Sequence, residues 1–256
     1  MKIKVGCVSY TNALPLIYYL HPDLTEVDFQ VPAELSRRFD AQAYDVALLP
    51  TFDWVIHENY QTVANLGIVS KGPVNSVILY SDKKISQIKT VKLDKDSKTS
   101  NALIEVLFKN YFKQDVKFVL EAPALAGVEA DAELLIGDKA LKNASLYPRV
   151  LDLGACWFEW TKLPFVFAAW MVLKNKDQNK EPGVSPAIEM FLKSAYQIGK
   201  SQIANIIESV AKEKQLSKAL LEEYYSKNIF YEIGPLELEG MNRFKLECQH
   251  VYKRGL

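Results

Sequence analysis

The chain has 256 residues, of which 49% are apolar and 24% charged, and its 31 basic and 31 acidic side chains give a formal net charge of zero. This length fits one large domain or two smaller ones, and the composition is that of a globular protein. Without a net positive field, binding to nucleic acid or to an anionic membrane is not expected. An acidic ligand has to be held by local groups.

Membrane, export and metal signals are weak in this sequence. The opening run MKIKVGCVSY loses its apolar character at Ser9, and the longest apolar run, LPFVFAAWMVL, is too short to cross a bilayer. We therefore expect a cytoplasmic protein that spans no membrane. Cys7, Cys156 and Cys248 are far apart and the three histidines are scattered, which predicts buried free thiols and no metal site. The oligomeric state is not indicated.

Apolar runs and helical periodicity alternate along most of the chain. Strands are predicted at IKVGCV, DVALLP, SVILYS, TVKL, VKFVL, ELLIG and RVLDL. Helices are predicted between them, at residues 13–20, 33–41, 51–60 (with Thr51 as its cap) and 99–112. From Pro186 onward three amphipathic helices follow one another with little strand between them. The alternation predicts an α/β protein with mixed, mostly parallel sheets.

Polar turns follow several of the predicted strands, where ligands bind in open parallel sheets. They are Ser9, Tyr10, Thr11 and Asn12; Pro50 and Thr51; Thr99 and Ser100; and Gly137 and Asp138, with Asn75 and Ser76 at the start of another strand. Each of these residues could simply cap a helix. If the turns converge, however, their hydroxyls and amides can surround a carboxylate without any fixed charge.

Common catalytic motifs are missing. The sequence has no GxSxG elbow, no GxxxxGK[ST] loop, no HExxH and no GxGxxG after the first strand, which disfavours nucleotide and metal chemistry. We expect no cofactor. The aromatic residues Trp157, Phe158, Trp160, Phe165, Phe167 and Trp170 are interpreted mainly as core, with the floor of a pocket as the alternative. The charged segment 174–186 is interpreted as a solvated connector, with a lid as the alternative.

Several of these segments together resemble the chorismate dehydratases of the futalosine route to menaquinone. They are SYTNALPL, GPVNSVILYS, SKTSNALIEVL, LLIGDKAL and DLGACWFEWTKLPFVFAAW, and the ending GPLELEGMNRF is similar too. The resemblance covers nearly the whole chain. Lys162 stands where that family is expected to have Gly, which concerns only the local turn. The run SYTN differs from the SPCPND-like opening of the sister enzyme that acts later in the route.

The resemblance implies the type II periplasmic-binding-protein-like fold, in which two α/β lobes are joined by two crossing strands and the ligand lies in the cleft. SVILYS would carry the chain into the second lobe and FVFAAWMVL would bring it back. Lobe one is then expected to comprise residues 1–81 and 172–256, and lobe two residues 82–171.

The resemblance also implies a hydro-lyase that converts chorismate to 3-[(1-carboxyvinyl)oxy]benzoate. Asn12 and Ser76 are the expected catalytic residues, holding the leaving hydroxyl and the substrate's own enolpyruvyl carboxylate, which would serve as the base. Asp138 is the alternative base. The expected substrate-binding residues are Ser9, Tyr10, Thr51, Asn75, Thr99, Ser100, Gly137 and Asp138. Two other functions stay open: a cytoplasmic small-carboxylate binding protein of the same fold, and the sister enzyme acting on a futalosine-derived nucleoside.

Overall fold

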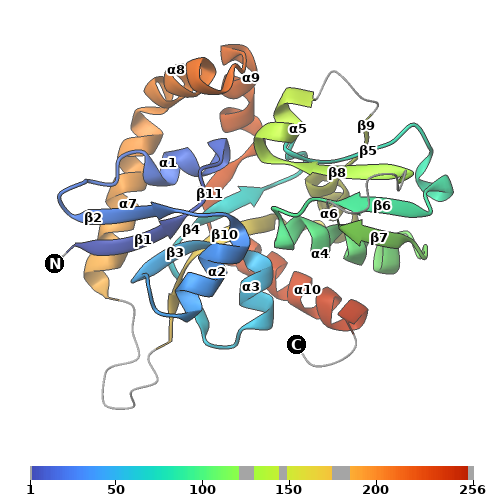
Figure 1. The fold of residues 1–256 in the computed structure, drawn as a ribbon, viewed down its shortest axis with the longest axis horizontal. Coiled ribbons are helices and arrows are strands. Elements are labelled where there is room, and N and C mark those ends of the chain that lie inside the picture. The colour runs from blue at the N-terminus through green and yellow to red at the C-terminus, as the bar shows by residue number, and fades with distance from the viewer. Residues whose placement is uncertain (1, 121–129, 144–148, 175–184, 253–256) are drawn as a thin grey trace.

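The computed structural model describes residues 2–120, 130–143, 149–174 and 185–252, whose strands form two sheets (Figure 1). One sheet contains β1 (Ile3–Cys7), β2 (Thr25–Phe29), β3 (Val46–Pro50), β4 (Tyr60–Ser70), β10 (Phe165–Leu173) and β11 (Phe230–Glu232). The other contains β5 (Val77–Tyr80), β6 (Thr90–Leu93), β7 (Lys117–Leu120), β8 (Ala132–Ile136) and β9 (Arg149–Asp152). The strand orders are β11-β4-β10-β3-β1-β2 and β7-β6-β8-β5-β9.

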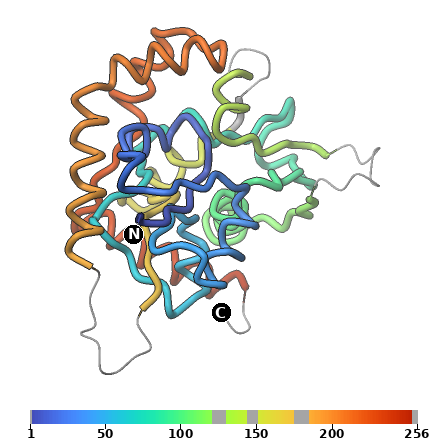
Figure 2. Tube along the Cα trace, turned by 60° about the vertical axis from the view of Figure 1, so that its left-hand side comes forward, coloured from blue at the N-terminus to red at the C-terminus, as the bar shows by residue number. Residues whose placement is uncertain are grey.

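Helices cover both sheets. They are α1 (Leu14–Ile17), α2 (Pro32–Asp40), α3 (Thr51–Ile56), α4 (Lys98–Val106), α5 (Gly137–Asn143), α6 (Leu153–Thr161), α7 (Pro186–Ser201), α8 (Ile203–Lys214), α9 (Lys218–Glu223) and α10 (Pro235–Tyr252). Short 3₁₀ turns are η1 (Thr11–Ala13) and η2 (Ile85–Gln87), and π-helical turns are η3 (Leu107–Tyr111) and η5 (Tyr224–Asn228). Figure 2 shows α7 and α8 along the side of the molecule away from β6 and β7.

Local sequence explains where several helices begin. Pro32 opens α2, whose Leu35 and Phe39 are fully buried four residues apart, as one face of a helix requires. The Ser97 hydroxyl caps α4 by accepting from the Ser100 amide at 3.2 Å. Lys162 ends α6 with a φ of 61°, a conformation that Gly adopts without strain. A left-handed backbone conformation favours Gly, which explains why Gly was expected here; in this chain Lys162 adopts that conformation.

The sheets are mixed, as predicted, but the strand directions differ from the expected pattern. Among the described strands, four neighbouring pairs are parallel and five are antiparallel. The antiparallel pairs all involve β4, β5 or β10, which run against their neighbours. β11 was not predicted. It lies among the C-terminal helices and pairs with the edge of β4.

The expected lobe boundaries cut through or close to two strands. β5 pairs with β8 and β9 in the five-stranded sheet, and β10 pairs with β3 and β4 in the six-stranded sheet. We therefore propose crossings just before each strand, so that residues 1–76 and 165–256 form one lobe and residues 77–164 the other. The expected boundaries at 81 and 172 ignored these pairings because an apolar run does not reveal which sheet it joins.

Burial agrees with the sequence for the thiols. Cys7, Cys156 and Cys248 are buried and free, as predicted.

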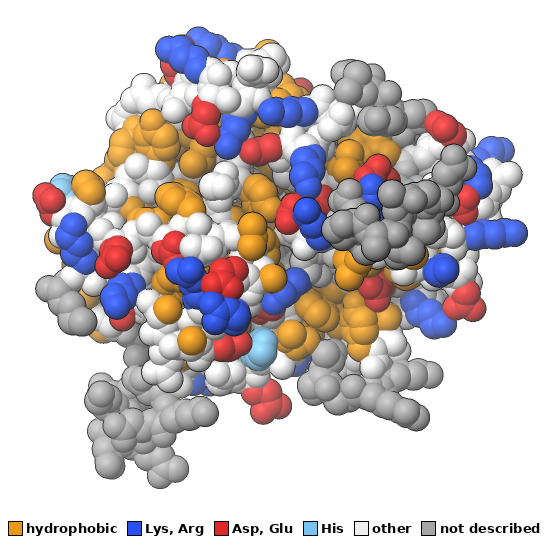
Figure 3. Space-filling model, viewed as in Figure 1, with side chains coloured by type: hydrophobic (Ala, Val, Ile, Leu, Met, Phe, Trp, Pro, Cys, Tyr) orange, Lys and Arg blue, Asp and Glu red, His pale blue; other side chains and the backbone are white. Residues whose placement is uncertain are grey.

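On the face seen in Figure 3, basic and acidic side chains are interspersed, in keeping with the formal net charge of zero. None of the described helices is both long and apolar enough to cross a bilayer. The predicted connector at 174–186 lies mostly outside the described residues.

Candidate active site

A narrow cavity of about 70 Å³ lies between the two sheets. Six of the ten predicted catalytic and substrate-binding residues line it: Tyr10, Asn12, Ser76, Thr99, Ser100 and Gly137. The cavity is small beside the roughly 300 Å³ or more of typical ligand sites. The elements on its two sides therefore have to separate before a ring-sized ligand can enter.

The other four predicted residues do not line this cavity. Ser9 is exposed. Thr51 is fully buried in the first turn of α3, and Pro50 takes the cap position in its place, so the predicted capping role of Thr51 is wrong. Asn75 is half-buried with a φ of 58° and stands next to Ser76. Asp138 accepts a hydrogen bond from the Thr11 amide at 3.2 Å, which joins the start of α5 to the turn after β1.

Asn12 and Ser76 meet at a tyrosine that the sequence did not indicate. The Tyr224 hydroxyl lies 2.8 Å from the Ser76 Oγ atom, and both residues are buried. Burial raises the pKa of Tyr224, and hydrogen bonding to Ser76 and Asn12 only partly opposes that rise. A phenol is a stronger donor than an alcohol, so Tyr224 donates to Ser76 and leaves the serine proton for another acceptor.

Asn12 keeps an unused acceptor in the site. Its carboxamide oxygen, Oδ1, is buried and has no hydrogen-bond partner among the described residues. A buried acceptor of this kind costs free energy unless a donor meets it. A hydroxyl or N–H group on a ligand would satisfy this acceptor, and Ser76 lines the same cavity.

The start of α4 supplies a second set of polar groups. Thr99 and Ser100 are buried in its first turn and line the cavity. The Thr99 Oγ1 atom accepts from the Phe52 amide at 3.1 Å, which fastens α4 to the start of α3. The partial positive charge at a helix N-terminus favours a carboxylate. Among the described lining residues there is no lysine or arginine, so this helix end is the main attraction for an anion.

One carboxylate lines the cavity, and it is Asp96 rather than Asp138. Lys139 holds Asp96 at 3.1 Å and Asp94 at 3.7 Å. Burial raises the pKa of Asp94. Burial also raises the pKa of Tyr10, and the carboxylates of Asp96, Asp94 and Asp138 add to that rise. Tyr10 is therefore a neutral hydrogen-bond donor at the mouth of the site, and no base at ordinary pH.

A half-buried aspartate shapes the turn that presents Ser76. Asp152 accepts hydrogen bonds from the amides of Val74 at 3.0 Å and Asn75 at 2.8 Å, and it caps α6 through the Ala155 amide. Three amides around one carboxylate fix the backbone just ahead of Ser76. Asp152 thus fixes the backbone that leads into Ser76, and Tyr224 binds the Ser76 hydroxyl directly.

The aromatic run divides between core and cavity. Trp157, Phe165 and Trp170 are almost completely buried in the core, as the main interpretation predicted. Phe167 is the member that lines the cavity, and Phe158 is partly exposed. A phenyl face beside polar groups suits a ligand with an unsaturated ring.

Several contributors to the site were missed, among them Tyr224, Asp96, Ser97 and Ile229. Asp96 stands three residues ahead of Thr99, where the predicted helix begins, and looks like an ordinary loop aspartate. Tyr224 belongs to a π-helical turn, a feature often found at functional sites, but nothing in the sequence marks such a turn.

Comparisons with known proteins agree with the geometry. A family model described as menaquinone biosynthesis matches residues 3–250. A chorismate dehydratase of Thermus thermophilus is 27% identical, covering 94% of this chain and 93% of that protein. A chorismate dehydratase of Campylobacter jejuni is 29% identical, covering 95% of this chain and 96% of that protein.

Solved structures show the same fold. A protein of Archaeoglobus fulgidus superposes with a TM-score of 0.73 at 16% identity, covering 98% of each chain. The alkanesulfonate-binding protein SsuA of Xanthomonas axonopodis pv. citri gives a TM-score of 0.69 at 14% identity, covering 98% of this chain and 92% of that one. The fold is therefore the two-lobed periplasmic-binding-protein-like fold. By its match over almost the whole sequence, the chain belongs to the menaquinone biosynthesis family.

Proposed function

We propose that this protein removes water from chorismate to give 3-[(1-carboxyvinyl)oxy]benzoate, the first step of the futalosine route to menaquinone. The observation that carries the proposal is the pair Asn12 and Ser76 in the lining of a cavity between the sheets, both in contact with Tyr224, with an acceptor and a proton left for the ligand. The two curated relatives, both chorismate dehydratases, support the choice of substrate.

The reaction needs little more than orientation and proton handling. The hydroxyl leaves C4 of chorismate and the proton leaves C3, so one water is released and the ring becomes aromatic. Loss of the C3 proton is favoured because the resulting charge spreads through the ring diene into the ring carboxylate. A site made of neutral hydrogen-bonding groups can therefore suffice, and no cofactor is needed.

Each polar group has a task in this scheme. Ser76, whose oxygen accepts from Tyr224, donates a hydrogen bond to the leaving hydroxyl, and the Asn12 oxygen accepts from that same hydroxyl. The proton taken from C3 passes to the departing oxygen, so that water leaves and Ser76 stays protonated. The start of α4, with Thr99 and Ser100, receives a carboxylate. Tyr10 donates a further hydrogen bond, and Gly137 lets the ligand approach the backbone before α5.

The base is proposed to be the enolpyruvyl carboxylate of the substrate. Asp96 and Asp138 are the protein carboxylates to test against it, because Asp96 lines the cavity and Asp138 bonds to the amide beside Asn12. In Asp96→Asn and Asp138→Asn we expect kcat within about tenfold of the wild type. A general base contributes roughly 10²- to 10⁴-fold, so a loss of that size in either variant, with chorismate binding retained, would assign the base to the enzyme.

Asn12→Ala tests the site directly. We expect turnover to fall about a hundredfold, the size typical of losing one group that stabilises a transition state, with little change in unfolding free energy. Asn205→Ala is the matched control, because Asn205 is exposed on α8 and its side chain bonds to the neighbouring Gln202. Turnover in Asn12→Ala equal to that of the control would remove Asn12 from the mechanism.

Purified protein mixed with chorismate separates the three candidate functions. The proposed activity replaces the diene absorbance with that of a substituted benzoate at a rate proportional to enzyme. A solute-binding protein would bind chorismate without changing its spectrum. Turnover of a futalosine-derived nucleoside in place of chorismate would identify the sister activity.

The location follows from the proposed substrate. Chorismate carries two carboxylates and does not cross a bilayer unaided, so the enzyme has to share a compartment with the source of chorismate. We propose the cytoplasm. Proteolysis of intact cells, which spares cytoplasmic proteins and digests exported ones, tests this.

A further inference from the structure

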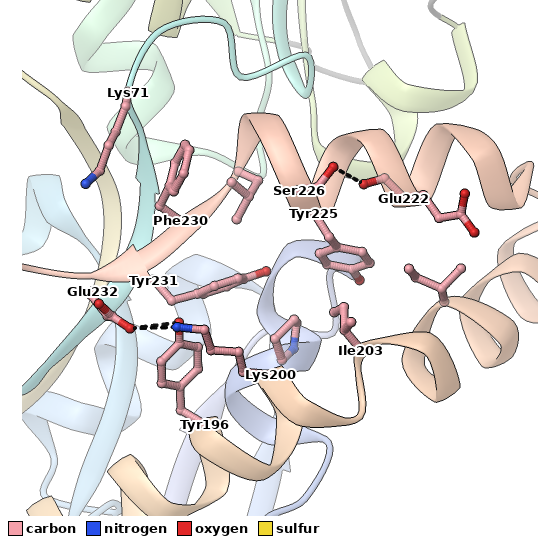
Figure 4. A pocket seen from close by; sticks show the side chains of 13 residues that line it. Lys71, Tyr196, Lys200, Ile203, Glu222, Tyr225, Ser226, Phe230, Tyr231 and Glu232 are labelled. Carbon is pink, nitrogen blue, oxygen red and sulfur yellow. Dashed lines mark hydrogen bonds and ion pairs between the residues drawn. The ribbon is translucent and has the colours of Figure 1, made fainter.

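A second and larger cavity, of about 520 Å³, lies on the other side of Ile229 from the candidate active site. The end of α7, the start of α8, the π-helical turn η5 and β11 form its walls (Figure 4). Ile229 lines both cavities. A volume of several hundred Å³ with mainly apolar walls is characteristic of sites for small organic ligands.

Aromatic rings form much of the wall. Tyr196, Tyr225, Phe230 and Tyr231 all line the cavity, and Figure 4 shows the last three around a common space. The rings of Tyr196 and Tyr231 lie 5.6 Å apart and are tilted to one another. Ring walls of this kind favour a flat ligand that stacks against them or meets them edge to face.

Both lysines that line the cavity form ion pairs with glutamates. Lys200 pairs with Glu232 at 3.1 Å, and Lys71 pairs with Glu237 at 3.0 Å. Glu222 is exposed, with its carboxylate at the far end of the cavity (Figure 4). The paired charges leave no strong field for an anion or for a cation. The walls therefore suit an uncharged molecule.

Two of the tyrosines connect this cavity to the active site. Tyr225 donates its hydroxyl proton to the carbonyl oxygen of Thr11 at 2.8 Å, and Tyr231 donates to that of Asn12 at 3.1 Å. Both carbonyls belong to η1, the short turn that presents the Asn12 side chain. A ligand that shifts either ring pulls on that turn.

We propose that this second cavity binds an uncharged, flat aromatic molecule of about two fused rings, and that the bound molecule alters η1 through Tyr225 and Tyr231. This inference goes beyond dehydration, because it requires neither chorismate nor its turnover. It makes the cavity an effector site, coupled to Asn12 by two hydrogen bonds.

The probe for the test is 6-propionyl-2-(dimethylamino)naphthalene, an uncharged fluorophore whose emission moves to shorter wavelength in apolar surroundings. We expect a saturable blue shift with one site per chain. Ile203→Trp fills the cavity from α8 and should weaken binding at least about tenfold. Ala204→Trp, at the exposed neighbouring position, is the matched control and should bind as the wild type does.

Coupling is read by hydrogen exchange of the peptide covering residues 9–17, with and without the probe. We expect its exchange rate to change on binding, and Tyr225→Phe to reduce that change while the probe still binds. A thermal melt of each variant checks that it folds. Equal binding in Ile203→Trp and Ala204→Trp, no saturable binding to the wild type, or displacement of the probe by chorismate through direct competition would overturn the site. Binding without any change in exchange would overturn the coupling. A chain inactive on chorismate can still pass every one of these tests.

Discussion

Tyr224 is the residue that joins the two proposed catalytic positions. Its hydroxyl reaches Ser76 across 148 positions of sequence, and its side chain also interacts with Asn12. Burial raises the pKa of Tyr224, so the phenol is protonated near neutral pH and acts as a hydrogen-bond donor. We therefore assign Tyr224 the role of positioning Ser76 so that the serine proton faces the ligand.

Tyr224→Phe tests that role. Removing the hydroxyl frees Ser76 to rotate, so we expect kcat to fall about tenfold while KM changes little, since no ligand contact is lost. The unfolding free energy should fall by about 1 kcal/mol, the cost of one buried hydrogen bond. Tyr44→Phe loses a tyrosine hydrogen bond to the Asp28 carboxylate; neither residue lines the cavity, so this variant should keep its kcat. If both variants lose the same stability and neither loses turnover, Tyr224 is structural only.

Some of the individual residues that line the cavity were predicted from the sequence. The polar turns next to predicted strands suggested Asn12, Ser76, Thr99 and Ser100 as binding residues, and the family resemblance singled out Asn12 and Ser76; all four line the cavity. Tyr224 was not, because Glu222 to Asn228 reads as the ordinary polar end of an amphipathic helix. Which of the two adjacent tyrosines reaches Ser76 depends on the π-helical turn, and that turn depends on tertiary contacts.

The contact between α1 and α7 shows how one element constrains another. A Cβ atom on Gly199 of α7 would lie 2.2 Å from the Pro15 carbonyl oxygen of α1. The two helices therefore approach backbone to backbone, and α1 directly follows the turn that carries Asn12. Helix propensity alone would favour Ala over Gly by about 1 kcal/mol. Here the close approach reverses that preference.

Gly199→Ala should accordingly destabilise the protein. Pushing α7 off α1 is overpacking, which typically costs about 1 to 3 kcal/mol and outweighs the gain in propensity. Urea unfolding measures the difference. Ser194→Ala, on the exposed side of the same helix, should be neutral or slightly stabilising, because it gains propensity without a clash. A Gly199→Ala protein more stable than the wild type would show that the helices can move apart freely.

Elements were predictable where the pattern was long or strongly apolar. The seven predicted strands from IKVGCV to RVLDL were placed correctly, since buried runs flanked by turns have few other interpretations, but β2 and β4 were not predicted as strands. β11 spans only Phe230–Glu232, too short for a pattern, and its pairing with β4 comes from the fold around it. Strand direction was missed because β5 and β10 are buried along almost their whole length and so read as the continuous apolar runs typical of parallel strands.

At the scale of the molecule, polar contacts close the cleft between the two sheets. Helix α4 follows β6 of the five-stranded sheet, and helix α3 follows β3 of the six-stranded sheet. The two helices pack on one another. Lys98 of α4 reaches Asp53 of α3 at 2.8 Å, and Ser36 of α2 bonds to the same carboxylate at 2.6 Å. The Thr11 amide and Asp138 make a second such contact. A cavity of about 70 Å³ requires these contacts to loosen as a substrate enters.

Lys98→Met should loosen this closure. Asp53 is fully buried, so without the ammonium group its charge keeps only the Ser36 hydroxyl as a partner. Loss of one member of a buried pair costs roughly 3 to 5 kcal/mol, and because the Lys98 side chain is 34% exposed we expect only about 1 to 3 kcal/mol in urea unfolding. Small-angle X-ray scattering should show a larger radius of gyration than in the wild type. Lys95→Met, at an exposed position three residues earlier, should leave both quantities unchanged. Equal stability and equal size in the two variants would mean that the contact between α3 and α4 does not hold the lobes together.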